Sequence, residues 1–375
     1  MSDQSNVTIG EYFSTLPDPR QEGKIRHELM DIIIIVICAV ISGCDEWTEI
    51  ELYANAKKSW FETFLKLPNG IPSHDTFSRV FSIISNDKLE ECFLGWINAV
   101  FEKTEKQVVA VDGKTLRRSH DRSSDKAAIH MVSAWAAKNQ ITLGQVQTDE
   151  KSNEITAIPE LLNLLEIKGC IVTIDAMGCQ KKIADQIIDQ GADYVLALKK
   201  NQGNLYEDVK LFFEDAQERN FDDIAVNYFE KVDGDHGRVE IRRYWTVSQI
   251  DWLHEKEKWK NLNIIAMAQL ETHKGEKETV DNRYFISSVS GDAQEFGTAV
   301  RTHWGIENSV HWILDVAFRE DDCRKRKGNS ASNFARVRRL ALNLLKNDKT
   351  IKAGVKAKRK RAGWDNEFIT QLLSS

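Results

Sequence analysis

The sequence of 375 residues lacks paired cysteines, an apolar run of membrane length and an excess of positive charge. Its six cysteines form no CxxC pair, which excludes a disulfide scaffold and a zinc ribbon. The longest apolar run, residues 32–41, is half of the about 20 residues that cross a bilayer, so it predicts a buried helix. A basic and apolar leader is also missing from residues 1–19, and we therefore expect a cytoplasmic protein.

The charge balance argues at first against a nucleic-acid partner, because 57 acidic side chains exceed 51 basic ones and the formal net charge is −6. The charge is unevenly distributed, however. Residues 324–361 hold 15 lysines and arginines and one acid, Asp348, whereas the other 337 residues carry 36 basic and 56 acidic side chains. The basic helical tail, residues 324–375, therefore fits contact with phosphates, with a solvated tail as the alternative.

The chain does contain enough apolar and aromatic surface for folded domains. It is 42% hydrophobic and holds 10 Trp, 7 Tyr and 16 Phe, and its length predicts two or three domains. Residues 1–105 have the pattern of an all-helical N-terminal domain, in which residues 73–84 are a candidate recognition helix for binding DNA ends. The alternative is a helical domain that packs on the core or forms a dimer.

From Gln107 the pattern changes to short apolar strands that alternate with helices. The segment QVVAVDG predicts the first strand, and AIHMVSAWAAK and ITLGQVQTD predict a hairpin. Two helix–strand pairs follow, so the expected order is β-β-β-α-β-α-β up to the strand DYVLALK. Residues 221–290 are β-rich again, and a long helical region begins near Ala293.

Two aspartates come at the ends of predicted apolar strands. Asp112 precedes Gly113, and Asp175 precedes Ala176. Acidic residues at the carboxyl ends of strands point into the crevice where α/β sheets place their sites, although an aspartate that begins a turn is also common. The sequence Asp112-Gly-Lys-Thr is not a phosphate-binding P-loop, because Val108 occupies the position of the required glycine.

A third acid, Glu307, lies in a predicted helix of residues 299–316. His303, Glu307, His311 and Asp315 recur every four residues and form one polar arc. A solvated face is the usual explanation, but the flanking tryptophans indicate partial burial, which would require partners or a metal. A zinc site built from the two histidines and Asp315 is disfavoured, because the histidines are too far apart on a regular helix.

Three carboxylates brought together would repel one another. Only bound divalent cations keep all three ionised, and hard oxygen ligands select Mg²⁺ or Mn²⁺. Two such ions roughly 4 Å apart can activate a water or a 3′-hydroxyl and stabilise the leaving oxygen of an in-line phosphoryl displacement. The predicted order of strands and helices fits an α/β, ribonuclease-H-like fold, which is a common scaffold for this chemistry.

Longer motifs, spread over nearly the whole chain, carry a more specific signal. The N-terminal region contains LPDPRQEGKIRHEL, CAVISGCDEW and GIPSHDTFSRVF, and the core contains AVDGKTLRRS, TDEKSNEITAIPELL, TIDAMGCQKKIA and DYVLALKKNQGNL. The later part adds HGRVEIRR, RYFISS, RTHWGIENSVHWILDVAFRED and GNSASNF. In this order the motifs resemble those of insertion-sequence transposases of the DDE class, and most closely those of the H-repeat-associated group.

The resemblance implies that Asp112, Asp175 and Glu307 are the catalytic DDE triad and that they bind two Mg²⁺ or Mn²⁺ ions. It also implies a catalytic domain of residues 106–375, with a β-rich insertion at about residues 205–290. We expect this domain to have a ribonuclease-H-like core.

The chain departs from the related transposase signature around the glutamate. That signature places a Tyr and an Arg before the glutamate and a Lys seven residues after it, where this chain has Val300, His303 and Leu314. The phosphate-contacting roles on this helix therefore stay open. The nearest substitutes, which we expect to contact DNA, are Arg301, His303, Arg324 and Lys325.

Six more polar side chains are expected to contact DNA. Two pairs follow predicted strands near the carboxyl edge of the sheet, and the third pair lies on a strand that alternates arginine with apolar residues. For each pair the alternative is a solvated loop or an ordinary edge strand. The six residues are Lys114, Arg117, Lys199, Asn201, Arg238 and Arg242.

The favoured function is a DNA transposase that cleaves phosphodiester bonds at the ends of its own element and joins the 3′-hydroxyls to target DNA. Its partners would be double-stranded DNA and a second copy of the chain in the DNA complex, with no membrane partner and with association to the nucleoid when bound. The alternatives are an inactive, transposase-derived DNA-binding protein and a ribonuclease-H-like nuclease without strand transfer.

Overall fold

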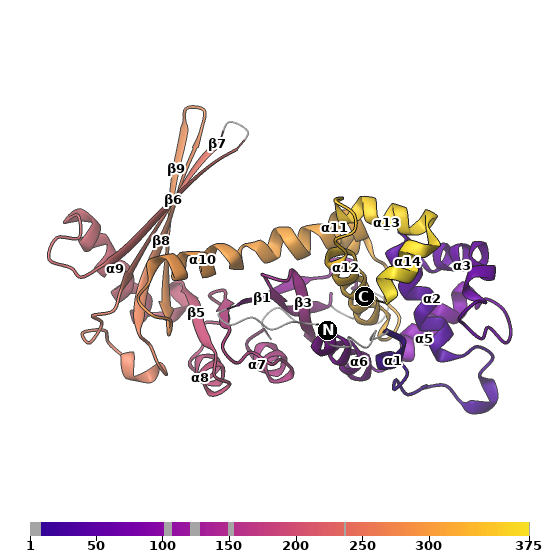
Figure 1. Ribbon diagram of the computed structural model, residues 1–375. Helices are drawn as coiled ribbons and strands as arrows, with labels where there is room; N and C mark the ends of the chain where they lie inside the picture. Colours follow the sequence, from indigo (N-terminus) through magenta and orange to yellow (C-terminus); the bar gives the residue numbers. More distant parts are fainter. Residues whose placement is uncertain (1–8, 101–106, 121–127, 149–153, 236–237, 375) are drawn as a thin grey trace, which may run out of the picture.

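The computed structural model describes residues 9–100, 107–120, 128–148, 154–235 and 238–374. The molecule is elongated (Figure 1). A helical body lies at one end, a sheet flanked by helices lies in the middle, and twisted strands extend from the other end. The fold is therefore mixed α/β, with an all-helical N-terminal segment.

The helical body begins with a helix that is apolar on all sides. The ten-residue apolar run lies in α2, and each of residues 32–41 is buried, which confirms the predicted buried helix. Among the residues that the structure describes, no helix combines the length and the apolar character needed to cross a membrane. The N-terminal helices are α1 (Ile9–Phe13), α2 (Leu29–Ile41), α3 (Trp47–Ala56), α4 (Lys58–Phe61), α5 (His74–Ile83) and α6 (Asn86–Val100).

Three C-terminal helices complete the same body: α12 (Ser330–Asn347), α13 (Val355–Trp364) and α14 (Asn366–Leu373). Helix α12 packs against α2, α5 and α6, and α13 packs against α2. Arg359 of α13 donates a hydrogen bond from Nη2 to the carbonyl oxygen of Val40 at 2.8 Å, so it caps the end of α2. The basic tail that the sequence assigns to the catalytic domain is thus a packed part of the helical body.

The middle of the molecule contains one continuous sheet of nine strands in the order β3-β2-β1-β4-β5-β9-β8-β7-β6. Strands β1, β2 and β3 are antiparallel, whereas β1, β4 and β5 are parallel to one another. The first five strands are β1 (Val108–Thr115), β2 (His130–Ala136), β3 (Ile141–Thr148), β4 (Ile171–Ile174) and β5 (Asp193–Leu198). With helices α7 (Glu154–Leu164) and α8 (Lys181–Asp189), they confirm the predicted order β-β-β-α-β-α-β.

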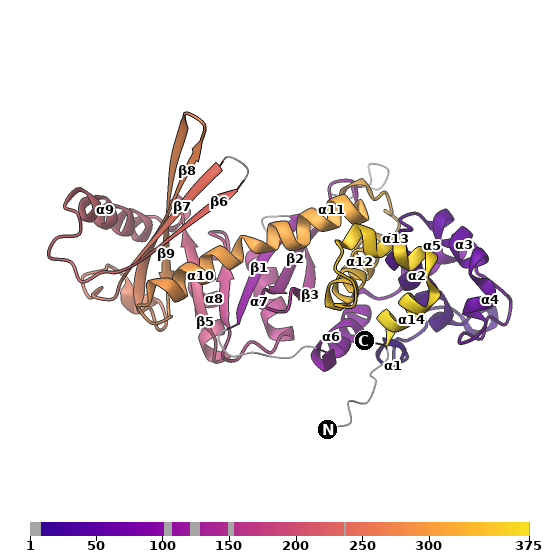
Figure 2. The ribbon, with the colours of Figure 1, turned by 45° about the horizontal axis from the view of Figure 1, so that its top comes forward.

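Helices cover both faces of this sheet. Successive side chains of a strand point to opposite faces, so each face has its own core. Val109, Val172 and Leu196 belong to the large core that includes α7 and α8. Their neighbours Val108 and Ile171 belong to a second core, which includes α10 (Ala293–His303) on the other face. Figure 2 shows α10 crossing the sheet from the β-rich end toward the helical body.

The predicted β-rich insertion extends the sheet. It contains helix α9 (Asn204–Glu218) and strands β6 (Asn227–Asp235), β7 (Arg238–Val247), β8 (Ile264–Lys274) and β9 (Lys277–Ser287). Strand β9 pairs antiparallel with β5, with Val195 opposite Ser287, and this pairing joins the insertion to the first five strands. The far ends of β6–β9 extend beyond the helices as an arm (Figures 1 and 2).

The long helical region after the sheet is not one continuous α-helix. A π-helical segment, Glu307–His311, separates α10 from α11 (Trp312–Phe318). Short π-helical turns widen a helix locally and are frequent at functional sites. The segment contains two members of the predicted polar arc, so the arc is not carried by a regular α-helix.

Candidate active site

Asp112 and Asp175 lie side by side on adjacent parallel strands. The register pairs Val111 of β1 with Ile174 of β4, and the two aspartates are the next residues along each strand. The turn predicted directly after Asp112 is wrong, because β1 continues to Thr115 in antiparallel pairing with β2. Only the parallel pairing with β4 ends before Asp112, at Val111, and Asp112 lies half-buried directly beyond it.

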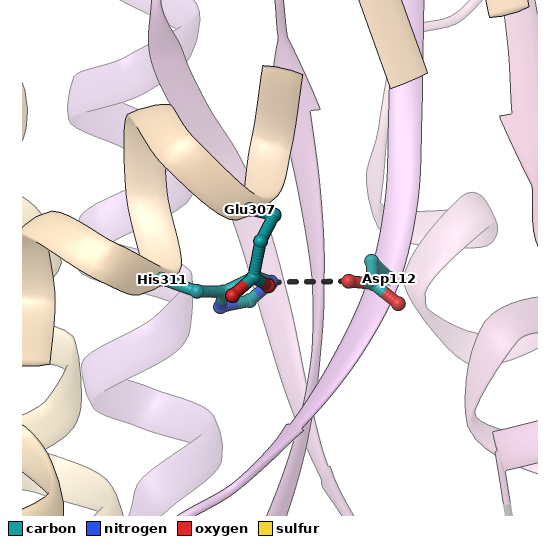
Figure 3. Close-up of side chains that lie close together, drawn as sticks. All are labelled: Asp112, Glu307 and His311. Carbon is teal, nitrogen blue, oxygen red and sulfur yellow. Dashed lines mark ion pairs between the residues drawn. The ribbon is translucent and has the colours of Figure 1, made fainter. Parts of the chain in front are cut away.

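Glu307 and His311 approach Asp112 from the π-helical segment on the opposite side (Figure 3). One ligand atom from each of Asp112, Glu307 and His311 lies within 4.8 Å of the other two. His311 Nε2 is 3.3 Å from Asp112 Oδ2. The structure therefore brings Glu307 to Asp112 across 195 residues of sequence, and it adds an imidazole to the pair.

Asp175 lies in the same cavity but outside this close group. Its Oδ1 atom accepts a hydrogen bond from the backbone N–H of Met177 at 3.0 Å, which fixes the carboxylate at the start of the turn after β4. Asp112, Asp175 and Glu307 all line one cavity of about 1050 Å³. Three carboxylates that share a cavity suit divalent cations, because oxygen ligands and negative charge are what Mg²⁺ and Mn²⁺ bind.

The charge state of Asp112 is set by its histidine neighbours. Burial acts to raise the pKa of Asp112, but His311 first and then His303 outweigh burial and lower this pKa below its usual range. Burial lowers the pKa of His303, against the opposing effect of Asp112 and Asp175. Its Nδ1 atom lies 3.0 Å from Thr173 Oγ1. The histidine neighbours thus favour the ionised form of Asp112.

The sequence-based alternative of a zinc site from His303, His311 and Asp315 is wrong. His303 pairs with Thr173, and Asp315 forms an ion pair with Lys114. Neither residue belongs to a group of converging ligands among the described residues. The polar arc therefore divides, because the π-helical segment turns only its middle members toward Asp112.

Several predicted DNA contacts line the cavity or lie beside it. Lys199 and Asn201 line the main cavity with His303, and Asn201 Nδ2 also donates to the carbonyl oxygen of Ala176 at 2.9 Å. Arg238 and Arg301 line a smaller cavity of about 250 Å³, which shares Glu307 with the main one. These side chains are positioned for a ligand that extends from the carboxylates.

Two other residues that were predicted to contact DNA form ion pairs with acidic side chains of the protein itself. Lys114 forms ion pairs with Asp315, with Glu320 at 3.1 Å and with Asp321 at 3.9 Å. Arg242 is 7% exposed and is paired with Asp233 and Glu240. Neither cation presents a free surface to phosphate in this structure.

Lys325 is also buried, which corrects its prediction as a DNA contact. It is 5% exposed, and its ammonium lies 4.2 Å and 4.9 Å from the ring centroids of Phe334 and Trp47. In contrast, its neighbour Arg324 is exposed. Arg117 is exposed as well, and its Nε atom lies 3.2 Å from Asp321 Oδ2.

Three residues that lie at the site were not predicted from the sequence. The sequence places His311 in the polar arc only. Its four-residue spacing from Glu307 is the signal that could have identified it as part of the site. Arg283 and Trp304 line both cavities, and the Arg283 guanidinium lies 4.0 Å from the centroid of the Trp304 ring. Arg283 comes from the insertion, so no local pattern could connect it with Glu307.

Comparison with known proteins agrees with this geometry. A family model described as "Transposase DDE domain" matches residues 103–344, and one described as "DDE_Tnp_1-associated" matches residues 10–97. The chain belongs to the DDE transposase family. The protein named "H repeat-associated putative transposase YhhI" from Escherichia coli K12 is 43% identical over 371 residues, which cover 97% of each chain. These relatives place the chain in the H repeat-associated group.

Further relatives vary in length and in their printed names. "Putative transposase YncI" from Escherichia coli O157:H7 is 44% identical over 378 residues, covering 97% of this chain and 94% of that protein. "Inactive transposase YbfQ" from strain K12 is 43% identical over 72 residues, or 19% of this chain and 86% of that protein. A solved piggyBac transposase synaptic complex with hairpin DNA aligns at 10% identity and a TM-score of 0.46, covering 98% of this chain and 77% of that one.

Proposed function

We propose that the protein is a metal-dependent DNA transposase that cleaves DNA at the ends of its element and joins the 3′-hydroxyls to target DNA. One observation carries the proposal: Asp112, Asp175 and Glu307 line a single cavity within the segment that matches the DDE domain. Cleavage and joining are both in-line attacks of an oxygen nucleophile on phosphorus, so one set of carboxylates serves both steps.

A ribonuclease-H-like core is the fold that we assign to this catalytic segment. The supporting feature is the strand order β3-β2-β1-β4-β5, in which three antiparallel strands are followed by two parallel ones. In this arrangement the parallel pairing of β1 with β4 ends directly before Asp112 and Asp175, and the π-helical segment after α10 carries the glutamate. We take residues 1–105 as a DNA-end-binding domain and residues about 205–290 as the insertion of this catalytic domain.

The carboxylates of Asp112, Asp175 and Glu307 would hold two Mg²⁺ or Mn²⁺ ions. When bound, the ions supply activation of the attacking oxygen and stabilisation of the leaving oxygen. The protein's own contribution is to orient the ligands. Met177 holds Asp175 through a backbone hydrogen bond, and the π-helical segment directs Glu307 toward Asp112.

Double-stranded DNA is the proposed partner, with a homodimer in the DNA complex and a cytoplasmic, nucleoid-associated location. The cavity-lining residues His303 and Asn201 are proposed to contact the strand that reacts. Phosphate contacts away from the carboxylates are assigned to exposed cations, since an unburied ammonium or guanidinium can release counterions from DNA. The exposed candidates are Arg117, Lys199, Arg238, Arg301 and Arg324.

The test is Mg²⁺-dependent cleavage of DNA that carries the element's ends. We expect Asp112→Ala, Asp175→Ala and Glu307→Ala each to abolish cleavage while binding to end DNA is retained. Asp251→Ala is the matched control, because the Asp251 side chain is 97% exposed and lines neither cavity. Cleavage at the unsubstituted rate by any triad variant would overturn the assignment of that acid.

One relative's printed name, which calls it inactive, makes an inactive DNA-binding derivative the second candidate. The cleavage assay separates this candidate from the transposase, because an inactive derivative binds end DNA without cutting it. A joining assay with pre-cleaved ends separates the remaining alternative. A nuclease without strand transfer would cut the ends but leave pre-cleaved 3′-hydroxyls unjoined.

A further inference from the structure

We propose that His311 is a direct ligand of the divalent cation held by Asp112 and Glu307, so that this position is a mixed nitrogen and oxygen site that favours Mn²⁺ over Mg²⁺. The inference rests on the metal requirement of the proposed function. It goes beyond that function, because the three-carboxylate triad includes no nitrogen ligand.

The first observation is that His311 is buried and lacks a hydrogen bond to any described residue, with Asp112 Oδ2 lying 3.3 Å from Nε2. Its side chain is 4% exposed, and neither Nδ1 nor Nε2 has a hydrogen-bond partner among the described residues. Buried polar side-chain atoms are nearly always hydrogen-bonded, so a ring with both nitrogens unsatisfied needs an explanation. A metal ion bound to Nε2 is one such explanation, and it also accounts for the direction in which the ring points.

The second observation is that the ring faces the carboxylates. Nε2 lies 3.3 Å from Asp112 Oδ2, and the three candidate ligand atoms converge within 4.8 Å (Figure 3). Two ligands of one cation with bonds of about 2.0–2.2 Å lie roughly 3–4 Å apart. The separation of the imidazole and the carboxylate is therefore already that of two ligands of a common ion.

The π-helical backbone explains how Glu307 and His311 reach the same point. The two residues begin and end the segment Glu307–His311 and are four positions apart. A π-helical turn has i→i+5 hydrogen bonds and is wider than an α-helical turn. Glu307 and His311 thus lie about one turn apart on the same side of the segment, and both side chains point toward β1.

The chemical consequence concerns the choice of metal. Mg²⁺ prefers oxygen ligands and retains water, whereas imidazole nitrogen suits transition metals. A set of two carboxylates and one imidazole therefore discriminates against Mg²⁺ relative to Mn²⁺. The other histidine that lines the cavity, His303, does not converge with Asp112 and Glu307. Its substitution therefore serves as the control for that of His311.

The experiment is pulsed electron paramagnetic resonance of Mn²⁺ bound to the full-length chain. We expect ¹⁴N modulation from a directly bound imidazole, and its replacement by ¹⁵N modulation when the histidines alone are labelled with ¹⁵N. Neither measurement needs a variant, so the inference stays testable even if substitution of a buried residue prevents folding.

Variants then identify the histidine. We expect His311→Gln to lose the nitrogen modulation and to weaken Mn²⁺ binding about tenfold or more, while Mg²⁺ binding changes less. His303→Gln should keep the modulation. Mn²⁺ binding without nitrogen modulation in the unsubstituted chain, or modulation lost only in His303→Gln, would overturn the inference and leave the proposed function intact. Mn²⁺ binding that survives in Asp112→Ala and Glu307→Ala would instead contradict the carboxylate site itself.

Discussion

Replacing Glu320 by Gln tests whether a buried charge network fixes strand β1 to the helical body. Glu320 is 1% exposed, and its carboxylate accepts hydrogen bonds from Arg339 Nη1 at 3.0 Å and from Lys114 Nζ at 3.1 Å. Lys114 lies in β1, two residues after Asp112, and Arg339 lies in α12. The carboxylate therefore joins β1, the strand that carries Asp112, to the C-terminal helices.

The size of the effect follows from the pKa of Glu320. Burial acts to raise this pKa, but the charges of Arg339, Lys114 and Arg338 outweigh burial and lower it from 4.5 to about 2. A difference of that size between the unfolded and folded states is worth about 3 kcal/mol of stability. Because the folded-state pKa is the lower one, this stability is present above about pH 4.5 and is lost as the pH falls toward 2.

We expect Glu320→Gln to lower the free energy of unfolding in urea at pH 7 by about 3 kcal/mol or more, because the amide leaves two buried cations without a compensating charge. Glu255→Gln is the matched control. Lys258 first and then Lys181 lower the pKa of Glu255 to about 2 as well, but Glu255 lies at the surface. Water screens surface ion pairs, so we expect its urea midpoint to stay unchanged.

The pH dependence gives a second, independent readout. The gap in unfolding free energy between the unsubstituted chain and Glu320→Gln should be constant from pH 7 to about pH 5 and should close as the pH approaches 2. An unchanged urea midpoint for Glu320→Gln at pH 7, or equal losses for the Glu320 and Glu255 variants, would refute the reasoning that burial gives this carboxylate its effect.

Two neighbouring cations and one glycine give further predictions. Lys325→Ala should lower the melting temperature without changing the salt dependence of DNA binding, because Lys325 is buried against Phe334. Arg324→Ala should do the reverse and reduce the salt slope by about 1, as measured by DNA titrations at several salt concentrations. Gly113→Val should cost about 2 kcal/mol in thermal unfolding, because a Cβ there meets the side chains of His130 and Glu154. The open site Gly354 provides the control substitution, Gly354→Val.

The parts of the fold that the sequence predicts are those set by local pattern. Apolar strands and their order could be read along the chain, and the aspartates that follow them meet because Val111 and Ile174 share a register. The pairing of Val195 with Ser287 could not be predicted, since it joins β5 to a strand about 90 residues later and no local signal specifies the partner.

The geometry around Glu307 shows a different limit. The four-residue recurrence of His303, Glu307 and His311 is visible in the sequence, but a regular helix would present all three on one face. The π-helical segment separates them, so that His311 approaches Asp112 while His303 contacts Thr173. Such a local widening depends on how the helix packs over the sheet and has no signature in the spacing.

The basic tail shows why total charge is a poor guide to DNA binding in this chain. Six of its 15 cations are buried, and they are Lys325, Arg336, Arg338, Arg339, Lys358 and Arg359. Arg336 pairs with Glu90 at 2.6 Å and Arg359 with Asp45 at 3.1 Å, so acids of the N-terminal segment neutralise the tail inside the helical body. A buried cation cannot release counterions from DNA. The salt dependence of DNA binding should therefore count the exposed cations alone, and variants of the buried ones should change stability instead.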